Sequence, residues 1–458
     1  MRKQWLVASM LLLGDLAALY GGLFLTLILR YGTELARPWE IHKIPFTIIF
    51  LVWLLIFFMV GLYEQGSWNA RRTVVERILR SMVAASIAAV VLFYLVETFG
   101  ITPKTNLIIQ TLFSLLLIIG WRMLASKILQ RTSKTNVLFF GASEEVRSLA
   151  ELLKANPQLG YEVSGLMTTD ESFNKELLLP KFIQEKNINL VVVSQDIHSN
   201  KELVDMLYNI LPLGVQFLDF PTFYERLTGK IPVSFISEVW FIENLVGKKE
   251  GYQFFKRIVD TILVLVLGIV SLILWPFITL GIILSTPHEA FNYKDYRARP
   301  GDGPIFFRQK RVGKNGRIFD FIKFRSQRLG SEKMSEVKET ANDPRQYPVG
   351  KILRAFYLDE LPQIINVLKG EMSLIGPRPE RPEYVTKLKE AIPFYEVRLL
   401  VPPGITGWAQ VNMKNDASVE DAPEKLQYDL YYIKNRSLAL DITIALKTIA
   451  VMLSRAGR

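Results

Sequence analysis

Four long apolar stretches lead the chain, at residues 5–29, 44–63, 78–96 and 107–124. Each is roughly 18 to 25 residues long, the length that a helix needs to cross about 30 Å of hydrocarbon. The first stretch is too long, and too soon followed by similar stretches, to be a cleaved signal peptide. The pattern predicts a membrane protein whose residues 1–130 form a four-helix transmembrane domain.

Basic residues near these stretches predict their orientation. They precede the first stretch, lie between the second and third, and follow the fourth; they are Arg2, Lys3, Arg71, Arg72, Arg77, Arg80, Arg122, Lys127, Arg131 and Lys134. Because cytoplasmic loops carry the excess of lysine and arginine, we expect both ends of the bundle in the cytoplasm. The loop between the first two stretches also carries Arg30, Arg37 and Lys43, which weakens the contrast.

Asp15 is an ionisable residue inside the first apolar stretch. Such residues are usually functional, because a charge in hydrocarbon is costly. The alternative is a structural role, in which Asp15 faces the bundle near the headgroups or forms a hydrogen bond with a neighbouring helix. The sequence suggests no basic partner at matching depth, and we favour the structural role.

After residue 134 the pattern changes to short, β-branched runs at 137–140, 163–167, 190–194 and 215–220. Helix-like stretches at 144–154 and 201–211 separate some of them, and this alternation predicts a parallel sheet with crossover helices. A dinucleotide fold requires GxGxxG after the first strand, but here Gly141 is followed by Ala142, Ser143, Glu144 and Glu145. We therefore predict a degenerate Rossmann-like domain over 131–250, structural or regulatory, with irregular linking strands at 224–247.

A fifth apolar run, at residues 258–285, is also long enough to cross a membrane. Basic residues lie on both sides of it, which disfavours a simple crossing; they are Lys248, Lys249, Lys256, Arg257, Lys294, Arg297, Arg299, Arg308, Lys310 and Arg311. Pro276 near its middle predicts a break. A re-entrant helix agrees with both observations, and a kinked fifth span remains the alternative.

Composition narrows the class of protein. Half of the 458 residues are hydrophobic and the formal net charge is +11. The basic residues lie beside apolar stretches, so anionic lipid or phosphorylated substrates are better partners than nucleic acid. The chain has no cysteine, and its three histidines, His42, His198 and His288, are far apart. Disulfides and thiolate chemistry are excluded, and a histidine-rich metal site is disfavoured.

The polar region after residue 285 carries the candidate chemistry. Asn315-Gly316 predicts a hairpin between strands at 305–308 and 317–325, in which Lys323 and Arg325 share one face. These cations could bind a diphosphate; a solvated strand face or lipid-headgroup contact is the alternative. Asp359-Glu360, followed by Pro362, is equally typical of the start of a helix.

The downstream sequence changes that balance. Residues 376–381 read Gly376, Pro377, Arg378, Pro379, Glu380 and Arg381, and residues 402–408 read PPGITGW. Arginine forks match phosphate oxygens, and prolines stiffen the loop that presents them. Carboxylates that precede such a loop suggest phosphoryl-group chemistry.

At these residues the chain resembles a known family. The strings KFR, LDELPQIINVLKGEMSLIGPRPERPEY, PPGITGWAQV and YDLYYIKNRSLALDITIALKT are similar to those of the bacterial sugar transferases, the monotopic phosphoglycosyl transferases. The leading stretches and the insert resemble the large form, the polyprenyl-phosphate hexose-1-phosphate transferases. This resemblance implies a mixed α/β monotopic catalytic domain over 251–458, a re-entrant membrane helix at 258–285, and a position on the cytoplasmic face of a bacterial inner membrane.

The resemblance also implies a reaction. Asp359 would be the nucleophile, and Asp359 and Glu360 would hold Mg²⁺. The substrates would be a UDP-sugar and undecaprenyl phosphate, bound by Lys323, Arg325, Gly376, Pro377, Arg378, Pro379 and Arg381. The sugar is not readable, and the oligomeric state is open, with a homodimer through the insert as one alternative. A non-catalytic nucleotide-sugar scaffold and a transporter are competing classes; the intact acidic pair disfavours the first, and the lack of paired intramembrane charges or twin broken helices disfavours the second.

Overall fold

The computed structural model describes residues 2–63, 72–96, 104–131, 134–141, 143–167, 179–194, 201–245, 250–291, 303–329, 343–413 and 419–454. They form two compact units, Met1–Phe223 and Tyr224–Arg458, and each is described by itself. The predicted three-domain division is not tested by this and stays a prediction. Some residues discussed above lie outside the described residues, namely Arg71, Ala142, His198, Lys248, Lys249, Lys294, Arg297 and Arg299.

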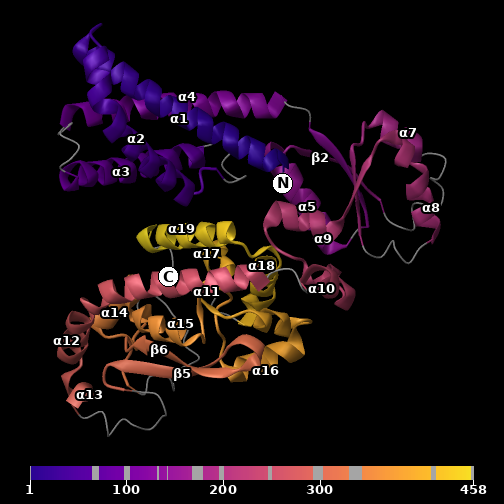
Figure 1. Cartoon of the computed structure of the whole chain (residues 1–458). Helices are drawn as coiled ribbons and strands as arrows, with labels where there is room; N and C mark the ends of the chain where they lie inside the picture. Colours follow the sequence, from indigo (N-terminus) through magenta and orange to yellow (C-terminus); the bar gives the residue numbers. More distant parts are fainter. Residues whose placement is uncertain are drawn as a thin grey trace. The chain divides into compact units, whose positions relative to one another are not determined.

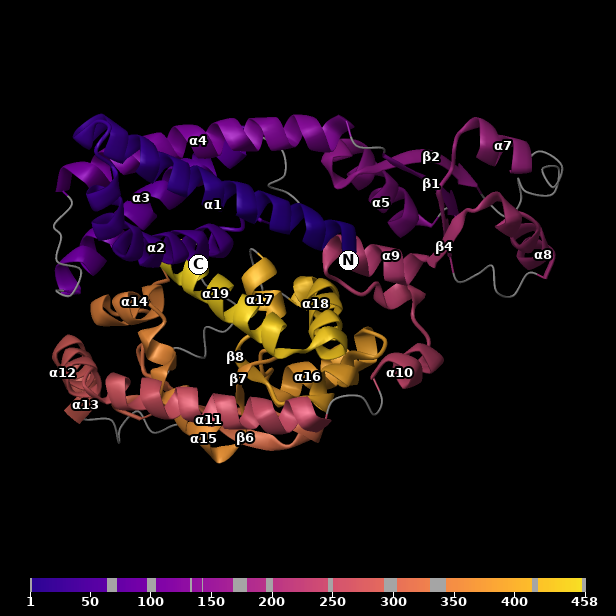
Figure 2. The ribbon, with the colours of Figure 1, turned by 45° about the horizontal axis from the view of Figure 1, so that its top comes forward.

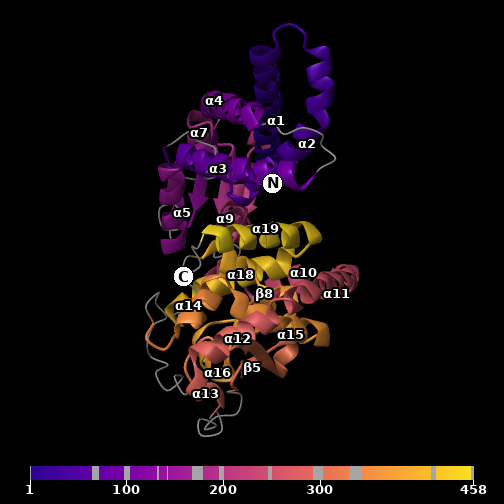
Figure 3. The same ribbon diagram turned by 90° about the vertical axis from the view of Figure 1, so that its left-hand side faces the viewer.

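The first unit begins with four apolar helices (Figure 1), α1 (Arg2–Tyr31), α2 (Ala36–Met59), α3 (Arg72–Leu95) and α4 (Lys104–Arg131). Within the described residues, each contains a stretch long and apolar enough to cross a membrane, which confirms the four predicted helices. α1 and α2 form a hairpin (Figure 3). Gly32 ends α1 with a φ of +66°, a left-handed conformation that glycine adopts without strain.

Buried polar side chains line α4 where it packs against α1. Asn106, Gln110 and Ser114 recur every four residues and so share one face of the helix. Gln110 Nε2 donates to the Leu19 carbonyl of α1 at 2.9 Å. Such contacts bring helices together in lipid, where apolar side chains alone gain little from pairing.

Arg122 of α4 binds Asp15 of α1 inside this bundle, so the expectation that Asp15 has no basic partner at matching depth is wrong. Arg122 Nε lies 3.2 Å from Asp15 Oδ1, and Arg122 Nη2 lies 2.5 Å from Oδ2. A third donor, Nη1, binds the Leu62 carbonyl at 2.8 Å. Arg122 lies within α4, which continues to Arg131. Its side chain is only 3% exposed.

The remainder of the first unit is a sheet of four parallel strands, β1 (Thr135–Phe140), β2 (Tyr161–Met167), β3 (Leu190–Val193) and β4 (Gln216–Asp219). Their order is β2-β1-β3-β4, as expected for crossover connections. α5 (Glu144–Ala155) lies on one face, and α7 (Leu179–Glu185) and α8 (Lys201–Asn209) lie on the other (Figure 1). Short turns of 3₁₀ helix, η3 (Pro157–Leu159) and η5 (Leu211–Leu213), precede β2 and β4.

Residues 224–245 form short helices joined by brief connections, and the expectation of irregular strands there is wrong. α9 (Phe220–Thr228), η6 (Val233–Phe235) and α10 (Glu238–Leu245) occupy this region; residues 246 and 247 lie outside the described part. Trp240 and Ile231 pack into the apolar core of the second unit, and Glu225 accepts from Lys434 Nζ at 2.7 Å. Contacts distant in sequence therefore decide the structure of a segment whose local pattern is weak.

The second unit begins with two helices that meet at an angle. α11 (Glu250–Leu272) and α12 (Trp275–Ser285) bend by 53° at residues 273–274, just before Pro276. The proline stands at an early position of α12, where its missing N–H costs no helical hydrogen bond. The predicted break is confirmed, and Figure 2 shows α11 alongside α15 (Ile364–Lys369), on which it packs.

Small elements surround these helices. They are α13 (Pro287–Phe291), β5 (Phe306–Val312), η8 (Lys314–Gly316), β6 (Ile318–Phe324), α14 (Pro348–Ala355), η10 (Leu358–Gln363), α15 (Ile364–Lys369), β7 (Ser373–Ile375), α16 (Pro382–Ala391), η11 (Tyr395–Leu400), β8 (Gly404–Thr406), α17 (Trp408–Asn412), η12 (Val419–Asp421), α18 (Ala422–Asn435) and α19 (Leu438–Ser454). β5 and β6 form the predicted antiparallel hairpin, with Asn315 and Gly316 at positive φ in its turn. β7 and β8 pair in parallel. The unit is a mixed α/β fold.

Candidate active site

The acidic pair lies in the first turn of η10, between α14 and α15. Tyr357 precedes this turn with a φ of +56°, so the chain reverses direction as it leaves α14. Asp359 is 1% exposed and Glu360 is 7% exposed. The acidic pair does occupy a helix start, as one interpretation predicted, but its near-complete burial is costly for two carboxylates unless cations lie nearby.

Two cations interact with the pair, and a third, Arg354, lies close to one of them. Arg378 Nη2 donates to Glu360 Oε1 at 3.0 Å. Lys323 of β6 is partly buried, and burial lowers its pKa to about 8, while Asp359 and Glu360 act to raise it. Arg378 and Arg354 of α14 lower it further by repulsion. Arg354 was not predicted from the sequence, because it lies before the acidic pair in a helix without a phosphate-binding motif.

Arg325 is not brought to the acidic pair by any contact of its guanidinium. Its Nε donates to the Pro304 carbonyl at 2.9 Å, Nη1 to Glu289 at 2.5 Å and Nη2 to Thr286 at 2.7 Å. These contacts connect β6 to α13 and the end of α12. Lys323 and Arg325 therefore have different surroundings, although strand alternation predicts one shared face.

The loop of residues 376–379 follows β7 and lies against residues 402–404. A Cβ on Gly376 would lie 2.5 Å from the Pro402 carbonyl oxygen, so only glycine fits there. Gly404 N donates to the Pro377 carbonyl at 2.9 Å. Pro377 and Pro379 cannot donate, and the rigid turn presents Arg378 toward Glu360.

Arg381 stands at the start of α16 and faces a cation-rich region. Its guanidinium lies 4.0 Å from Glu383 and over the ring of Tyr384. Burial lowers the pKa of nearby Arg311 to about 10, with Glu380 opposing this and Arg378 and Arg381 adding to it. An anion bound here would relieve repulsion among these arginines.

Trp408 packs a loop. Its Nε1 donates to the Gly229 carbonyl at 2.9 Å, and its ring stacks on Tyr431 with centroids 5.5 Å apart. A role of Trp408 as a stacking platform for uracil is not favoured, because both the polar edge and one face of its ring are already engaged.

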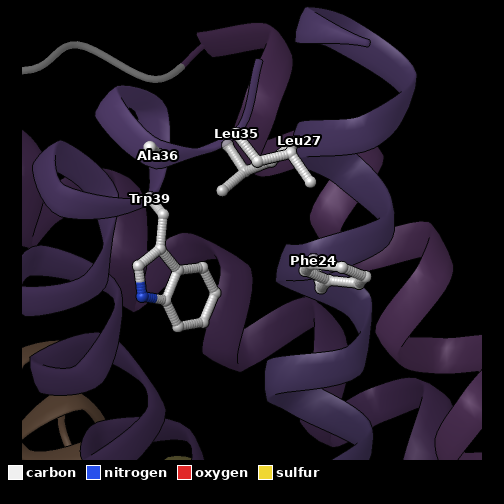
Figure 4. A pocket seen from close by; sticks show the side chains of 5 residues that line it. All are labelled: Phe24, Leu27, Leu35, Ala36 and Trp39. Carbon is white, nitrogen blue, oxygen red and sulfur yellow. The ribbon is translucent and has the colours of Figure 1, made fainter. Parts of the chain in front are cut away.

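A separate apolar cavity lies in the transmembrane helices (Figure 4). It measures about 310 Å³ and is lined by Phe24, Leu27, Leu35, Ala36 and Trp39. The lining offers one indole N–H and no charged group, so it does not match a nucleotide or a diphosphate. The chemistry suited to phosphate lies in the second unit.

Comparison with known families places these residues in context. Residues 251–455 match the family described as bacterial sugar transferase, and residues 58–215 match one described as CoA-binding domain. The first match includes the acidic pair, the loop 376–379 and the surrounding cations. The second begins before α3 and includes β1 to β3.

Three curated proteins are similar to the chain. A UDP-N-acetylgalactosamine-undecaprenyl-phosphate N-acetylgalactosaminephosphotransferase of Aeromonas hydrophila is 39% identical over 51% of this chain and 51% of its own length. A UDP-glucose:undecaprenyl-phosphate glucose-1-phosphate transferase of Xanthomonas campestris pv. campestris is 30% identical over 68% of this chain and 65% of its own. An undecaprenyl-phosphate galactose phosphotransferase of Salmonella typhimurium is 28% identical over 75% and 74%.

The match to the first two relatives thus spans about half to two thirds of their lengths. Three differently named sugars occur among the three proteins, so similarity alone selects none of them. The quoted motifs, the site built from them and these matches agree on one conclusion: residues 251–455 belong to the bacterial sugar transferase family.

Proposed function

We propose that the chain transfers a hexose-1-phosphate from a UDP-sugar to undecaprenyl phosphate, the first step in assembling a bacterial surface polysaccharide. The observation that carries the proposal is the buried acidic pair, with Arg378 bound to Glu360 and Lys323 and Arg354 nearby. The names of the similar proteins support the acceptor and the class of donor.

The reaction proceeds in two displacements at one phosphorus. A carboxylate oxygen of Asp359 attacks the sugar-linked phosphorus, and the bond to UMP breaks. The phosphate oxygen of undecaprenyl phosphate then attacks the same phosphorus and releases Asp359, giving undecaprenyl-diphosphate-sugar. Two steps through a covalent carboxylate predict ping-pong kinetics. The burial of Asp359 supports this route, because water is kept from the aspartyl phosphoester.

The cations and Glu360 prepare the site for an anionic donor. Lys323, Arg378 and Arg381 hold the diphosphate and the charge that develops on it. Glu360, held by Arg378, orients the incoming phosphate. Arg325 supports the strand that carries Lys323 through its contacts with Glu289 and Thr286.

The donor set also fits Mg²⁺. Within the described part of the chain, no group of three His, Cys, Asp or Glu could hold a metal. Mg²⁺ commonly takes one or two protein carboxylates and completes its shell with phosphate and water, and Asp359 and Glu360 would supply them. Gln363, in the same turn, is fully buried with neither amide atom hydrogen-bonded within the described protein, which leaves another oxygen donor. When bound, the metal would neutralise charge between carboxylate and diphosphate.

We propose a re-entrant arrangement for α11 and α12. Before the bend, Lys256 Nζ binds Asp441 of α19 at 2.9 Å. After the bend, Glu289 binds Arg325 at the end of β6. Both flanks thus bind the same compact unit, whereas a crossing would separate them by about 30 Å of hydrocarbon. Exposed apolar side chains near the bend, such as Ile269 and Phe277, suit lipid.

The remaining parts of the chain complete the proposal. We place the second unit on the cytoplasmic face of a bacterial inner membrane, with Arg122 removed from the charge count because Asp15 binds it. The α/β insert acts as a Rossmann-like relic with a structural or regulatory role; Glu144 and Glu145 would repel a pyrophosphate at the start of α5. A homodimer through this insert stays a prediction.

Trapping the covalent intermediate tests the proposed function. Purified protein is incubated with UDP-sugars labelled in the hexose, without lipid acceptor, and label on the denatured protein is measured together with released UMP. We expect label and UMP in equal amounts. Asp359→Asn should lose both by a factor on the order of 10³ or more, as for other nucleophile substitutions.

Asp320→Asn is the matched control, because it neutralises an exposed carboxylate of the hairpin and should retain normal labelling. Activity of Asp359→Asn near that of the parent would refute the nucleophile. Absence of UMP release from every UDP-sugar in the panel would favour the scaffold alternative.

A further inference from the structure

The backbone carbonyls of residues 378–380, at the end of the loop that carries Arg378, accept hydrogen bonds from other parts of the second unit. Arg398 Nη2 donates to the Arg378 carbonyl at 2.9 Å, and Arg311 Nη1 donates to the Pro379 carbonyl at 3.0 Å. Val312 N donates to the Glu380 carbonyl at 2.9 Å. Arg378, whose guanidinium binds Glu360, therefore has its own backbone carbonyl bound by Arg398.

Arg398 is oriented by a second set of contacts. Its Nε donates to Asp429 Oδ2 at 3.0 Å, and its Nη1 donates to the Tyr395 hydroxyl at 2.7 Å. Arg398 is 4% exposed and Asp429 is 1% exposed. With every nitrogen of the guanidinium engaged, the planar group has one orientation, and Asp429 of α18 sets it.

Glu380 extends this arrangement to the side chains. Its Oε1 accepts from Lys425 Nζ at 2.7 Å, and Arg398 Nη1 lies 3.9 Å away. Although burial acts to raise it, Lys425 and Arg398 lower the pKa of Glu380 to about 2. The Glu380 carboxylate is therefore ionised at neutral pH.

We propose that Arg398 is a positioning residue for the donor diphosphate: held by Asp429, it fixes the Arg378 carbonyl and so aims the Arg378 guanidinium. This rests on the proposed function. A loop with two prolines has few hydrogen bonds of its own, so its geometry depends on these external donors. A misplacement of about 1 Å at a phosphate-binding group costs on the order of 10²-fold in rate.

A double-mutant cycle tests the proposal through UMP release at varied UDP-sugar concentration. Arg398→Lys keeps the charge but loses the planar fork. We expect kcat/KM for the donor to fall about tenfold in the parent background and by less than twofold in the Arg378→Ala background. A residue that stabilised only the fold would lower kcat/KM by the same factor in both backgrounds.

Amide hydrogen exchange gives a readout that does not depend on activity. Exchange over residues 373–381 should be faster in Arg398→Lys than in the parent. Asp429→Asn, which keeps the side-chain shape, should show the same change and serves if Arg398→Lys does not fold. Lys434→Met is the matched control: it removes a partly buried ion pair with Glu225 in the same unit and should leave both readouts unchanged.

The outcomes separate the two ideas. Additive losses in the cycle, or unchanged exchange over residues 373–381, would overturn the positioning role. If the parent releases no UMP from any UDP-sugar, the proposed function fails, and the exchange comparison still decides whether Arg398 holds the loop.

Discussion

The molecule buries charge in two regions and in two different ways. In the transmembrane helices, Arg122 and Asp15 form a closed pair: two guanidinium nitrogens bind two carboxylate oxygens, and the third binds the Leu62 carbonyl. Both side chains are at most 3% exposed. One positive and one negative charge cancel, each guanidinium nitrogen has an acceptor, and no ligand is needed.

At the acidic pair of the second unit, positive charges outnumber negative ones. Lys323 is attracted by both carboxylates and Arg378 binds Glu360, while the charge of Arg354 also acts on Lys323. Burial lowers the pKa of Lys323 to about 8 even though both carboxylates act to raise it. Keeping Lys323 protonated in the folded protein therefore lowers the free energy of unfolding. A closed ion pair thus serves the fold, whereas a surplus of one sign marks the place where an oppositely charged ligand binds.

Breaking the closed pair should produce the largest change in stability. Arg122→Met leaves Asp15 buried without its cation, and we expect a loss of about 3–5 kcal/mol in the free energy of unfolding. Removing both charges, as Asp15→Asn with Arg122→Met, should recover most of that loss. Thermal unfolding in detergent micelles gives the comparison.

Lys127→Met is the control for that experiment, because it removes an exposed cation from the same helix. It should change stability little. If the double variant is no more stable than Arg122→Met, the pair is not self-contained and the first half of the comparison fails.

The surplus charge should instead appear in the pH dependence of activity. Above pH 8, Lys323 loses its proton in the free enzyme, so kcat/KM for the UDP-sugar should fall about tenfold per pH unit. Lys323→Arg stays charged and should show no such fall up to pH 9.5. Initial rates of UMP release between pH 6.5 and 9.5 measure both profiles; a parallel fall in the two proteins would contradict the role of Lys323.

Over the same pH range, the contribution of Lys323 to the free energy of unfolding should rise. The pKa of Lys323 is lowered from 10.5 to about 8 in the folded protein, so between these values the unfolded chain binds the proton more tightly. The contribution of Lys323 to the free energy of unfolding therefore rises as the pH increases through this window. Activity that falls while stability rises would show that the charge is retained for the ligand.

Local patterns in the sequence were sufficient for many of the elements, although not for residues 224–245, and for the start of the short helix that carries the acidic pair. The apolar lengths predicted α1 to α4, β-branched runs predicted β1 to β4, and Asn315-Gly316 predicted the hairpin. These features depend on residues that are close together in the chain, where periodicity and turn chemistry are informative.

Side-chain partners were not predictable in the same way. Asp15 and Arg122 are 107 residues apart, and Arg398 and Asp429 are 31 apart. No spacing rule connects such positions, because the contacts exist only after helices and strands have packed. Arg325 shows the same limit: strand alternation placed it beside Lys323, but Glu289 and Thr286, which precede β5, bind its guanidinium.

Removing an exposed ion pair should produce the smallest change in the free energy of unfolding. It separates the effect of burial from that of contact distance. Lys310 and Asp320 face each other across β5 and β6 with 2.9 Å between Nζ and Oδ1, close to the 2.5 Å of Arg122 and Asp15. Their side chains are 64% and 50% exposed, so water screens the attraction. Lys310→Met should change the free energy of unfolding by less than about 0.5 kcal/mol, and less in high salt. A loss as large as that of Arg122→Met would mean that contact distance, not the surrounding medium, sets the strength of these pairs.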